Sequence, residues 1–238
     1  MIRLTCGDCL DVLPTIAPGS VDLILADPPY GITSCKWDSV IDLAALWPLL
    51  HRAAKPNAAI VMTASQPFTT TLIASNIKNF KYAWVWDKRA AANFAAAKYQ
   101  PLKIHEDIVV FKGLYRPLMT KGEKRMKGGR KATSGDVSKN IKPHYHESDL
   151  YYPKSILTFK GERGYHPTQK PIALMEYMIK TYTNEGETVL DFTMGSGSTG
   201  VAAKNLKRSF IGIEIDPAYC EIAGERIGAP VNYPTALW

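Results

Sequence analysis

The chain has 238 residues, 46% of them hydrophobic and 21% charged, and a formal net charge of +7. These values predict a soluble globular protein with room for one α/β domain and an insertion. No transmembrane helix and no signal peptide are expected, because no run of about 18 apolar residues occurs and the charged start MIRLTCGDCLDVL has no apolar core.

The four cysteines, Cys6, Cys9, Cys35 and Cys220, are scattered along the chain. Cys6 and Cys9 form one CxxC pair, but no second Cys or His pair follows at the spacing of a zinc site. We therefore expect every cysteine to be a buried or half-buried thiol and the protein to be cytoplasmic.

Apolar patterns in the first half of the chain predict strands that alternate with helices. Strands are expected at residues 2–5, 21–26, 59–63, 80–87 and 104–111. Helices are expected from residue 8 to about residue 13, at residues 43–54 with an irregularity at Pro48, and at residues 66–76 with Pro67 in the first turn. The last two strands can form an antiparallel pair at the edge of a sheet.

The second half begins with residues 113–160, which lose this periodicity and are typical of a mobile loop. Regular elements then return, with helices predicted at 172–182, 198–206 and 217–227, strands at 188–191 and 210–215, and no clear element in the tail from residue 228. Strands separated by helices predict an α/β fold, a Rossmann-like, mostly parallel, twisted sheet with one antiparallel edge strand.

The sequence VDLILADPPYG at residues 21–31 is the first candidate for chemistry. Its apolar run suits a strand buried on both faces of a parallel sheet, and the run stops at Asp27. Pro28 and Pro29 lack N–H donors, so the strand cannot continue its pairing there. The result is a stiff loop at the carboxyl end of a strand, where open α/β sheets bind ligands.

This loop combines a carboxylate, free carbonyl groups and an aromatic ring. The exocyclic amine of a nucleobase is a poor nucleophile, because its lone pair is delocalised into the ring. Asp27 and the carbonyl of Pro28 can each accept one N–H from such an amine, which favours a pyramidal nitrogen with a free lone pair. Tyr30 can stack on a base taken out of its helix. An ordinary turn, with Asp27 as a cap and Tyr30 at the rim, is the alternative.

A second candidate site is the loop GSGSTG at residues 195–200, which follows a predicted strand and opens a helix. Its glycines allow close approach of the backbone, and Glu214, 17 residues after Gly197, can accept both ribose hydroxyls of an adenosine-containing cofactor. A dinucleotide oxidoreductase is one interpretation. Only 24 residues follow Glu214, however, so the remaining strands must come from residues 1–111 and the order of the elements is permuted.

The positive charge is concentrated in one segment. Residues 112–163 hold 13 Lys plus Arg and 5 Asp plus Glu, whereas the rest of the chain has a net charge of −1. We therefore predict a catalytic domain at residues 1–111 and 164–238, and a target-recognition insertion at residues 112–163 that contacts a polyanion. A solvated loop is the alternative, but interleaved aromatic residues favour nucleic acid.

Three motifs in this order, DPPY at 27–30, HPTQKP at 166–171 and DFTMGSGSTG at 191–200, resemble the S-adenosylmethionine-dependent DNA amino-methyltransferases of the β class. The resemblance covers about residues 2–111 and 164–227 and implies the circularly permuted methyltransferase fold. The family usually has Phe two positions before the first glycine of the loop, where this chain has Thr193, with Phe192 beside it. This departure leaves open which side chain packs on the cofactor.

The resemblance implies a role for each matching residue. The amine-activating motif would be Asp27, Pro28, Pro29 and Tyr30, with Asp27 also near the amino group of the methionine moiety. The cofactor pocket would be formed by Asp8, Asp27, Thr168, Gln169, Lys170, Asp191, Thr193, Gly195, Ser196, Gly197, Ser198 and Glu214. Within it, Asp8 would meet the adenine amino group and Glu214 the ribose. A helix cap for Asp8 and a surface charge for Lys170 are the alternatives.

Double-stranded DNA is the expected partner. The candidate phosphate contacts are Lys88, at a strand end on the active edge, and the cluster Lys124, Arg125, Lys127, Arg130 and Lys131. No metal is expected, because methyl transfer from a sulfonium requires an aligned, dry site instead of a Lewis acid. The histidine of the pair His105-Glu106, at a strand start, is interpreted as structural.

The sequence thus predicts an enzyme that methylates the N6 amine of adenine in double-stranded DNA after base flipping. Asp27 favours adenine by family resemblance. The N4 amine of cytosine is the close alternative, and a non-catalytic nucleic-acid binder with a decayed cofactor site is the third interpretation. A homodimer is expected, as in many members of the family. The recognition sequence and the existence of a partner restriction endonuclease stay open.

Overall fold

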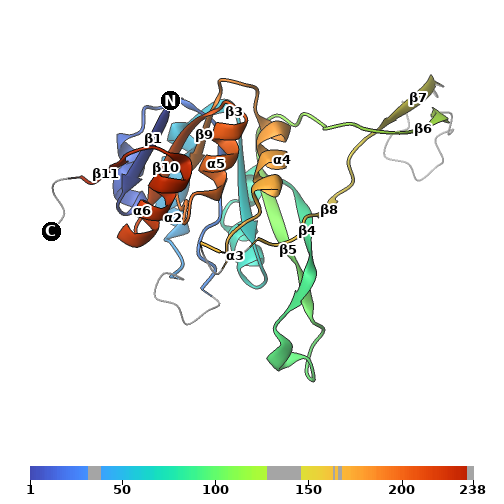
Figure 1. Ribbon diagram of the computed structural model, residues 1–238, viewed down its shortest axis with the longest axis horizontal. Helices are drawn as coiled ribbons and strands as arrows, with labels where there is room; N and C mark the ends of the chain where they lie inside the picture. The colour runs from blue at the N-terminus through green and yellow to red at the C-terminus, as the bar shows by residue number, and fades with distance from the viewer. Residues whose placement is uncertain (32–38, 128–145, 163, 166–167, 235–238) are drawn as a thin grey trace. The chain divides into compact units, whose positions relative to one another are not determined.

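The computed structural model describes residues 1–31, 39–127, 146–162, 164–165 and 168–234 (Figure 1). The chain divides into two compact units. The first comprises residues 1–116 and 155–238 and contains a large sheet with helices, and the second comprises residues 117–154. Within the described ranges, no helix is long and apolar enough to cross a membrane.

A nine-stranded sheet of described residues forms the centre of the first unit. Its strands lie in the order β11 (Val231–Asn232), β1 (Ile2–Cys6), β10 (Ser209–Glu214), β9 (Thr188–Asp191), β2 (Val21–Ala26), β3 (Ala54–Ala64), β5 (Lys103–Phe111), β4 (Phe80–Ala92) and β8 (Ile156–Thr158). Neighbouring strands pair parallel, except that β5 pairs antiparallel with both β3 and β4. The predicted mostly parallel sheet is confirmed, but its antiparallel strand lies inside the sheet because β4 and β8 continue beyond it.

Strands from the two ends of the chain are interleaved at the centre of this sheet. β9 and β10 follow residue 187, yet they lie between β1 and β2. Leu23 of β2 pairs with Val189 of β9 in parallel register, so the loops after these two strands leave the same edge of the sheet side by side. The predicted permuted order is confirmed, and it brings the DPPY loop next to the glycine loop.

Helices cover both faces of the sheet (Figure 1). One face carries α1 (Cys9–Val12), α2 (Leu43–Ala53) and α3 (Phe68–Ser75), and the other carries α4 (Ile172–Tyr182), α5 (Ser198–Asn205) and α6 (Pro217–Ile227). In β2, Ile24 belongs to the core under α2, whereas Leu23 and Leu25 belong to the core under α4 and α5. Burial on both faces therefore explains the unbroken apolar run of this strand.

Local signals explain the helix boundaries. The carboxylate of Asp42 accepts from the N–H of Ala44 at 2.9 Å and caps α2, which continues through Pro48. Asp216 caps α6 in the same way, and the helix ends at Gly228, whose φ of 71° is a left-handed conformation that favours glycine. Short 3₁₀ helices occur at Leu13–Thr15, Ile77–Asn79 and Phe94–Ala96.

The second unit contains two strands where the sequence predicted a loop. β6 (Thr120–Lys127) pairs antiparallel with β7 (His146–Tyr151), with a shift in register between Lys121 and Arg125. The loop prediction for residues 113–160 is also wrong at β8, which joins the main sheet, and the tail contains the short strand β11. Polar strands such as TKGEKRMK are held by the backbone ladder and show no apolar alternation, so periodicity cannot reveal them.

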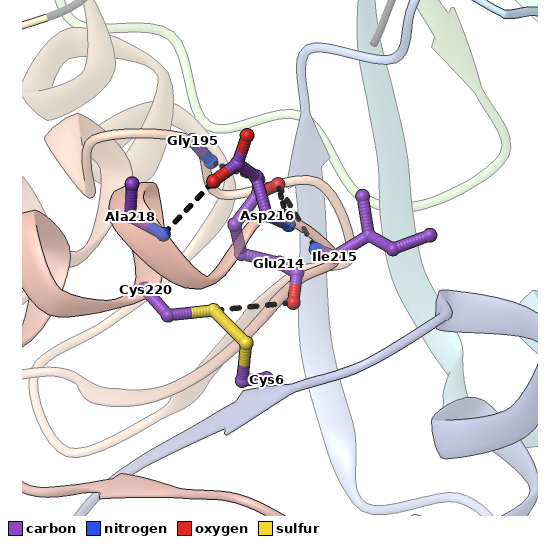
Figure 2. The surroundings of a disulfide bond; sticks show 7 residues. All are labelled: Cys6, Gly195, Glu214, Ile215, Asp216, Ala218 and Cys220. Atoms are coloured by element: carbon purple, nitrogen blue, oxygen red, sulfur yellow. Dashed lines mark hydrogen bonds between the residues drawn. A yellow bond between two sulfur atoms is a disulfide. The ribbon is translucent and has the colours of Figure 1, made fainter. Parts of the chain in front are cut away.

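Cys6, the last residue of β1, forms a disulfide with Cys220 of α6 (Figure 2). The expectation of a thiol at every cysteine is therefore wrong for this pair, which is separated by 214 positions and meets only because α6 packs against β1. Cys9 is a buried free thiol, and burial, aided by the charge of Asp8, raises its pKa to about 12. Cys35 lies outside the described residues.

Candidate active site

A cavity of about 660 Å³ opens at the edge of the sheet where the parallel strands end. Its walls come from the loops after β1, β2, β9 and β10, from the segment 168–170, and from β4 and β5. The DPPY loop and the glycine loop therefore face one cavity, as the pairing of β2 with β9 requires. This is the usual place for a ligand in an open α/β sheet.

Glu214, the last residue of β10, holds the glycine loop in place (Figure 2). Its Oε2 accepts from the N–H of Gly195 at 2.8 Å, and its Oε1 accepts from the N–H groups of Ile215 and Asp216 at 2.9 Å each. Burial raises the pKa of Glu214, although these three donors oppose the rise. Glu214, for which the sequence predicted a contact with the ribose, thus positions the glycine loop.

The glycine loop has a backbone that only glycine adopts easily. Gly195 has a φ of 51° and Gly197 a φ of 83°, both in the left-handed region. At Gly197 a Cβ would also come within 3.1 Å of the side chain of Ala223. The loop therefore lies tight against α6 and opens α5, with Ser196 and Ser198 buried in the cavity wall.

Buried polar groups beside this loop fit a polar ligand. The hydroxyl oxygens of Thr193 and Ser198 are buried and, within the described part of the chain, have no hydrogen-bond partner. Asp191 is 2% exposed and accepts from the N–H of Thr193 at 3.1 Å. Burial raises the pKa of Asp191 to about 7. Because buried polar groups in native proteins are normally satisfied, these hydroxyls fit a ligand with polar groups in the cavity.

The two remaining open assignments on the cofactor side concern Asp8 and Phe192. Asp8 caps α1 by accepting from the N–H of Leu10 at 2.8 Å, and it also lines the cavity, so the cap does not exclude a ligand contact. Phe192 and Thr193 both line the cavity, but Phe192 is 1% exposed and belongs to the hydrophobic core.

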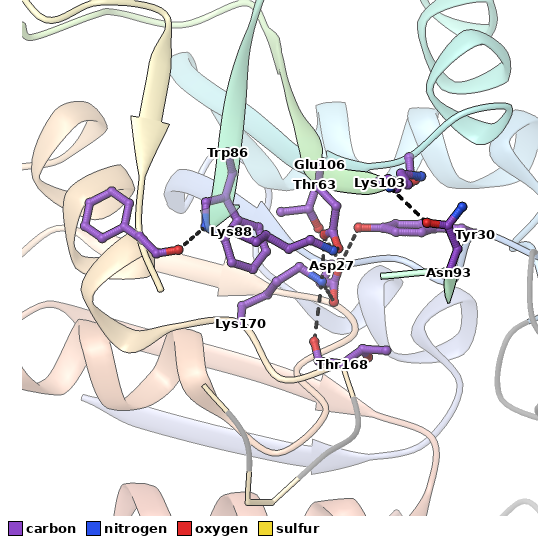
Figure 3. A network of polar contacts seen from close by, with 12 residues as sticks. Asp27, Tyr30, Thr63, Trp86, Lys88, Asn93, Lys103, Glu106, Thr168 and Lys170 are labelled. Carbon is purple, nitrogen blue, oxygen red and sulfur yellow. Dashed lines mark hydrogen bonds and ion pairs between the residues drawn. The ribbon is translucent and has the colours of Figure 1, made fainter. Parts of the chain in front are cut away.

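Asp27 lies at the centre of a polar network (Figure 3). Its Oδ1 accepts from the hydroxyl of Tyr30 at 2.7 Å and from the hydroxyl of Thr63, which is buried in β3. Its Oδ2 accepts from the ammonium of Lys170 at 2.5 Å. Asp27 is thus a carboxylate fixed by side-chain donors on both of its oxygens and not the free cap of a turn.

The Tyr30 ring is also fixed. It stacks on Phe68, with 5.5 Å between the ring centroids and 22° between the planes. Burial, followed by the charge of Asp27, raises the pKa of the phenol well above its ordinary value. Tyr30 therefore remains a protonated donor to Asp27, which is a role that the stacking hypothesis did not include.

Lys170 is 6% exposed, so the alternative of a surface charge is wrong. Its ammonium lies 2.5 Å from Asp27 Oδ2 and 3.4 Å from Oε2 of Glu106, and Lys88 donates to Oε1 of Glu106 at 2.9 Å. Burial alone would lower the pKa of Lys170, but the two carboxylates outweigh it and raise the pKa. The two lysines and two carboxylates therefore form a charged network at the cavity wall (Figure 3).

The neighbours of Lys170 also line the cavity. The side chain of Gln169 is buried, accepts from the N–H of Tyr165 at 3.2 Å and donates to Glu162 at 3.3 Å. The backbone carbonyl of Thr168 lies 3.5 Å from the Lys170 ammonium. The predicted segment 168–170 thus lines the same cavity as the glycine loop.

The predicted DNA-contacting residues belong to both units of the chain. Lys88 is mostly buried and paired with Glu106 in the first unit. In the second unit, Lys124 pairs with Glu147 at 2.9 Å and Arg125 with Glu123 at 3.0 Å, and both cations are exposed. Lys127 ends β6, and Arg130 and Lys131 lie outside the described residues.

Sequence patterns did not predict Glu106 and Thr63 as parts of the site. Glu106 is near the start of β5, and because β5 runs opposite to its neighbours, its beginning lies at the edge where the parallel strands end. A carboxylate at the start of an antiparallel strand could therefore have been recognised as a candidate once the direction of that strand was known.

Residues 21–225 match the model of the N6_N4_Mtase family, described as DNA methylase. The chain belongs to this family. Membership confirms the expectation of an S-adenosylmethionine-dependent DNA amino-methyltransferase. Among the described residues of this DNA methylase, no group of three His, Cys, Asp or Glu side chains is arranged to hold a metal ion.

Curated relatives of this DNA methylase include two type II methyltransferases. M.HpaI of Haemophilus parainfluenzae is 27% identical over 242 residues, which cover 97% of this chain and 75% of that protein. M2.DpnII of Streptococcus pneumoniae is 29% identical over 250 residues, which cover 94% and 88% of the two chains.

Solved structures show the same fold. The complex of M1.HpyAVI with SAM has a TM-score of 0.66 and 26% identity, covering 95% of this chain and 99% of that one. PvuII DNA methyltransferase, described as cytosine-N4-specific, has a TM-score of 0.68 at 14% identity, covering 94% and 87%. The second likeness shows the fold alone.

Proposed function

We propose that the protein transfers a methyl group from S-adenosylmethionine to the N6 amine of adenine in double-stranded DNA. The observation that carries this proposal is the position of Asp27. Its carboxylate is held at the carboxyl end of β2, in the same cavity as the glycine loop after the neighbouring strand β9. An amine acceptor and a cofactor loop thus face each other across one site.

The residues on the cofactor side fit S-adenosylmethionine. The unsatisfied hydroxyls of Thr193 and Ser198 and the carboxylate of Asp191 would meet the polar methionine end, and Glu214 and Asp8 the ribose and the adenine. The bound cofactor supplies an activated methyl group on a sulfonium.

On the target side, the chain's own groups prepare the amine. Asp27 and the carbonyl of Pro28 each accept one N–H, which leaves the nitrogen lone pair free to attack the methyl carbon. The bound sulfonium would give up its methyl group and keep the electron pair of the broken carbon–sulfur bond, and the proton lost by the nitrogen would pass to water. We propose that the Tyr30 ring, which stacks on Phe68, also contacts a flipped base.

We propose residues 112–163 as the target-recognition insertion, with the second unit at its centre. The exposed cations Lys124 and Arg125 support phosphate contacts, because their pairs with Glu147 and Glu123 are solvent-exposed and therefore weak. We also propose a homodimer, and light scattering after size-exclusion chromatography measures its mass. We propose a cytoplasmic location because DNA is the proposed substrate, although the Cys6–Cys220 disulfide is unusual in that compartment.

Cytosine N4 is the second candidate target, because the fold is shared with a methyltransferase described as cytosine-N4-specific. The test incubates mixed-sequence DNA with S-adenosylmethionine that carries a labelled methyl group. The DNA is then digested to nucleosides, which are separated by chromatography and identified by mass spectrometry. Label in N6-methyladenine supports the proposal, and label in N4-methylcytosine replaces it with the second candidate. Methylation-sensitive sequencing of the same DNA then gives the recognition sequence.

The matched control for this experiment is Asp27→Ala, which should bind the cofactor but transfer no label. Calorimetry provides an independent check of the cofactor site. Binding of S-adenosylmethionine should raise the melting temperature by linkage. An absence of heat with this cofactor, together with tight binding of NAD, would overturn the assignment of the cavity.

A further inference from the structure

The proposed target amine meets an acceptor that is already occupied. Asp27 Oδ1 accepts from Tyr30 and Thr63, and Oδ2 accepts from the ammonium of Lys170 at 2.5 Å. A charged donor competes strongly with a neutral amine for the same carboxylate oxygen, because charge-assisted hydrogen bonds are about twice as strong as neutral ones. Oδ2 keeps a second lone pair, but an amine that docks there shares the oxygen with a charged donor, so docking is favoured when Lys170 moves away from Oδ2.

Glu106 offers Lys170 a second carboxylate at short range. Its Oε1 accepts from Lys88 at 2.9 Å. Its Oε2 is buried, has no hydrogen-bond partner among the described residues, and lies 3.4 Å from the Lys170 ammonium. A buried carboxylate oxygen without a hydrogen bond is costly, so the structure contains an acceptor that Lys170 approaches but does not satisfy.

We propose that Glu106 is a positioning residue that receives the Lys170 ammonium when the target amine docks on Asp27. The inference rests on the proposed function of Asp27. The Lys170 Nζ lies 3.4 Å from Glu106 Oε2, so it must move by less than about 1 Å to reach the usual length of a hydrogen bond between an ammonium and a carboxylate. A lysine side chain makes this movement by small rotations, with its buried stem unchanged.

Charge favours an exchange of the ammonium over a transfer of its proton. The groups that face Lys170 are Asp27, Glu106 and the Tyr30 ring, and those that face Glu106 are Lys170 and Lys88. Burial would raise the pKa of Glu106, but the two lysines outweigh it and lower the pKa. Glu106 therefore stays ionised at neutral pH and can pair with the Lys170 ammonium when it moves.

A purely structural role is the competing explanation. Glu106 pairs with Lys88, which joins the adjacent strands β5 and β4, and a scaffold role would make Glu106 important without any exchange. The two explanations differ in one respect. Exchange makes the effect of Glu106 depend on the presence of Lys170, whereas a scaffold role does not.

The experiment is a double-mutant cycle of Glu106→Gln and Lys170→Met, read out as single-turnover methylation of duplex DNA. Glu106→Gln should slow methyl transfer about 10- to 100-fold, since a hydrogen bond to a charged group is lost. Its affinity for S-adenosylmethionine should stay within about twofold. In the Lys170→Met background, Glu106→Gln should slow methyl transfer by less than about threefold more. The reason is that Glu106 no longer has a Lys170 ammonium to receive.

The matched control is Asp22→Asn. Asp22 is a carboxylate of similar exposure to Glu106, at 13% against 15% for the side chains, and pairs with Lys55 at 2.7 Å. It does not line the cavity. This variant should methylate DNA at the wild-type rate. A defect in Glu106→Gln alone would then come from loss of the exchange and not from loss of an ion pair of similar exposure.

The pH profile gives a second readout. Without Glu106, the pKa of Lys170 falls, because one of the two carboxylates that raise it is absent. Deprotonation weakens the competition of Lys170 for Asp27, so the deficit of Glu106→Gln should narrow as the pH rises into the alkaline range. A scaffold defect would not narrow in this way.

A crystal structure of the wild type with S-adenosylhomocysteine and a duplex of the recognised sequence tests the same point if Glu106→Gln fails to fold. Lys170 should then lie within hydrogen-bond distance of Glu106 and away from Asp27 Oδ2. Wild-type rates for Glu106→Gln, equal effects in the two Lys170 backgrounds, or Lys170 unmoved in that complex would each overturn the inference. If the wild type methylates no DNA, the proposed function is overturned and this inference with it.

Discussion

The ammonium of Lys170 lies 2.5 Å from the carboxylate of Asp27, although 143 positions separate the two residues in the chain. This contact joins the DPPY loop to the segment that begins α4. It also makes Asp27, the proposed amine-activating carboxylate, part of a charged network, so we expect changes on either side of the contact to affect both catalysis and stability.

Replacing Asp27 by Ala should reduce methyl transfer by at least about 100-fold, because the main acceptor for the target amine is removed. The structure adds an effect on folding. Lys170 keeps only Glu106 as a carboxylate partner, so the free energy of unfolding should fall by about 1–3 kcal/mol. Single-turnover kinetics and thermal denaturation measure the two effects. Near-normal turnover would remove Asp27 from the mechanism.

Tyr30→Phe is a sharper test than the sequence suggested. A stacking role needs only the ring, which predicted a mild effect, but the Tyr30 hydroxyl donates to Asp27 at 2.7 Å. Losing this donor to a charged acceptor should slow methylation about tenfold. Tyr30→Ala should weaken binding of a flipped base by a further ~1–3 kcal/mol. Fluorescence of 2-aminopurine at the target position reports flipping, and a Phe variant as fast as the wild type would leave stacking as the only role.

Asp191 should make the unliganded protein less stable as the pH rises. Its pKa is about 7 in the folded protein and near 3.8 in an unfolded chain, so the folded state retains a proton that the unfolded state has released. Stability from this group is present at low pH and is lost between about pH 4 and pH 7. Asp191→Asn should therefore raise the melting temperature at pH 8 relative to the wild type and have little such effect near pH 4.

The same Asp191→Asn variant should bind S-adenosylmethionine more weakly at pH 8, because the amide has no charge to pair with the amino group of the methionine moiety. Calorimetry at pH 6 and pH 8 compares the two proteins. Equal affinities at both values, or a stability difference independent of pH, would contradict the role assigned to the carboxylate.

The basic cluster should control the salt dependence of DNA binding. Replacing Lys124, Arg125, Lys127, Arg130 and Lys131 together by Ser should weaken binding and reduce the salt slope by about one for each phosphate that is no longer neutralised. The control replaces Lys55 and Lys207, two exposed lysines of the first unit, by Ser. Fluorescence anisotropy over a range of salt gives both slopes. An unchanged slope in the cluster variant would support the solvated loop instead.

The sequence alone determined the central strands, the two loops and the permuted order. The reason is that these features are local: an apolar run buried on both faces, prolines that end a strand, and glycines that adopt left-handed φ are each visible within about ten residues. The weakly patterned strands β6, β7, β8 and β11 were missed, because backbone pairing with a distant partner leaves no apolar period in the sequence.

Only the tertiary structure decided which of these local features meet. Glu106 joins the site because β5 runs against its neighbours, and Lys170 is buried because residues 168–170 fold back over the end of β2. Cys6 and Cys220 bond because α6 packs on β1. Each pairing depends on strand direction and on packing between segments far apart in the chain, and neither composition nor spacing specifies those.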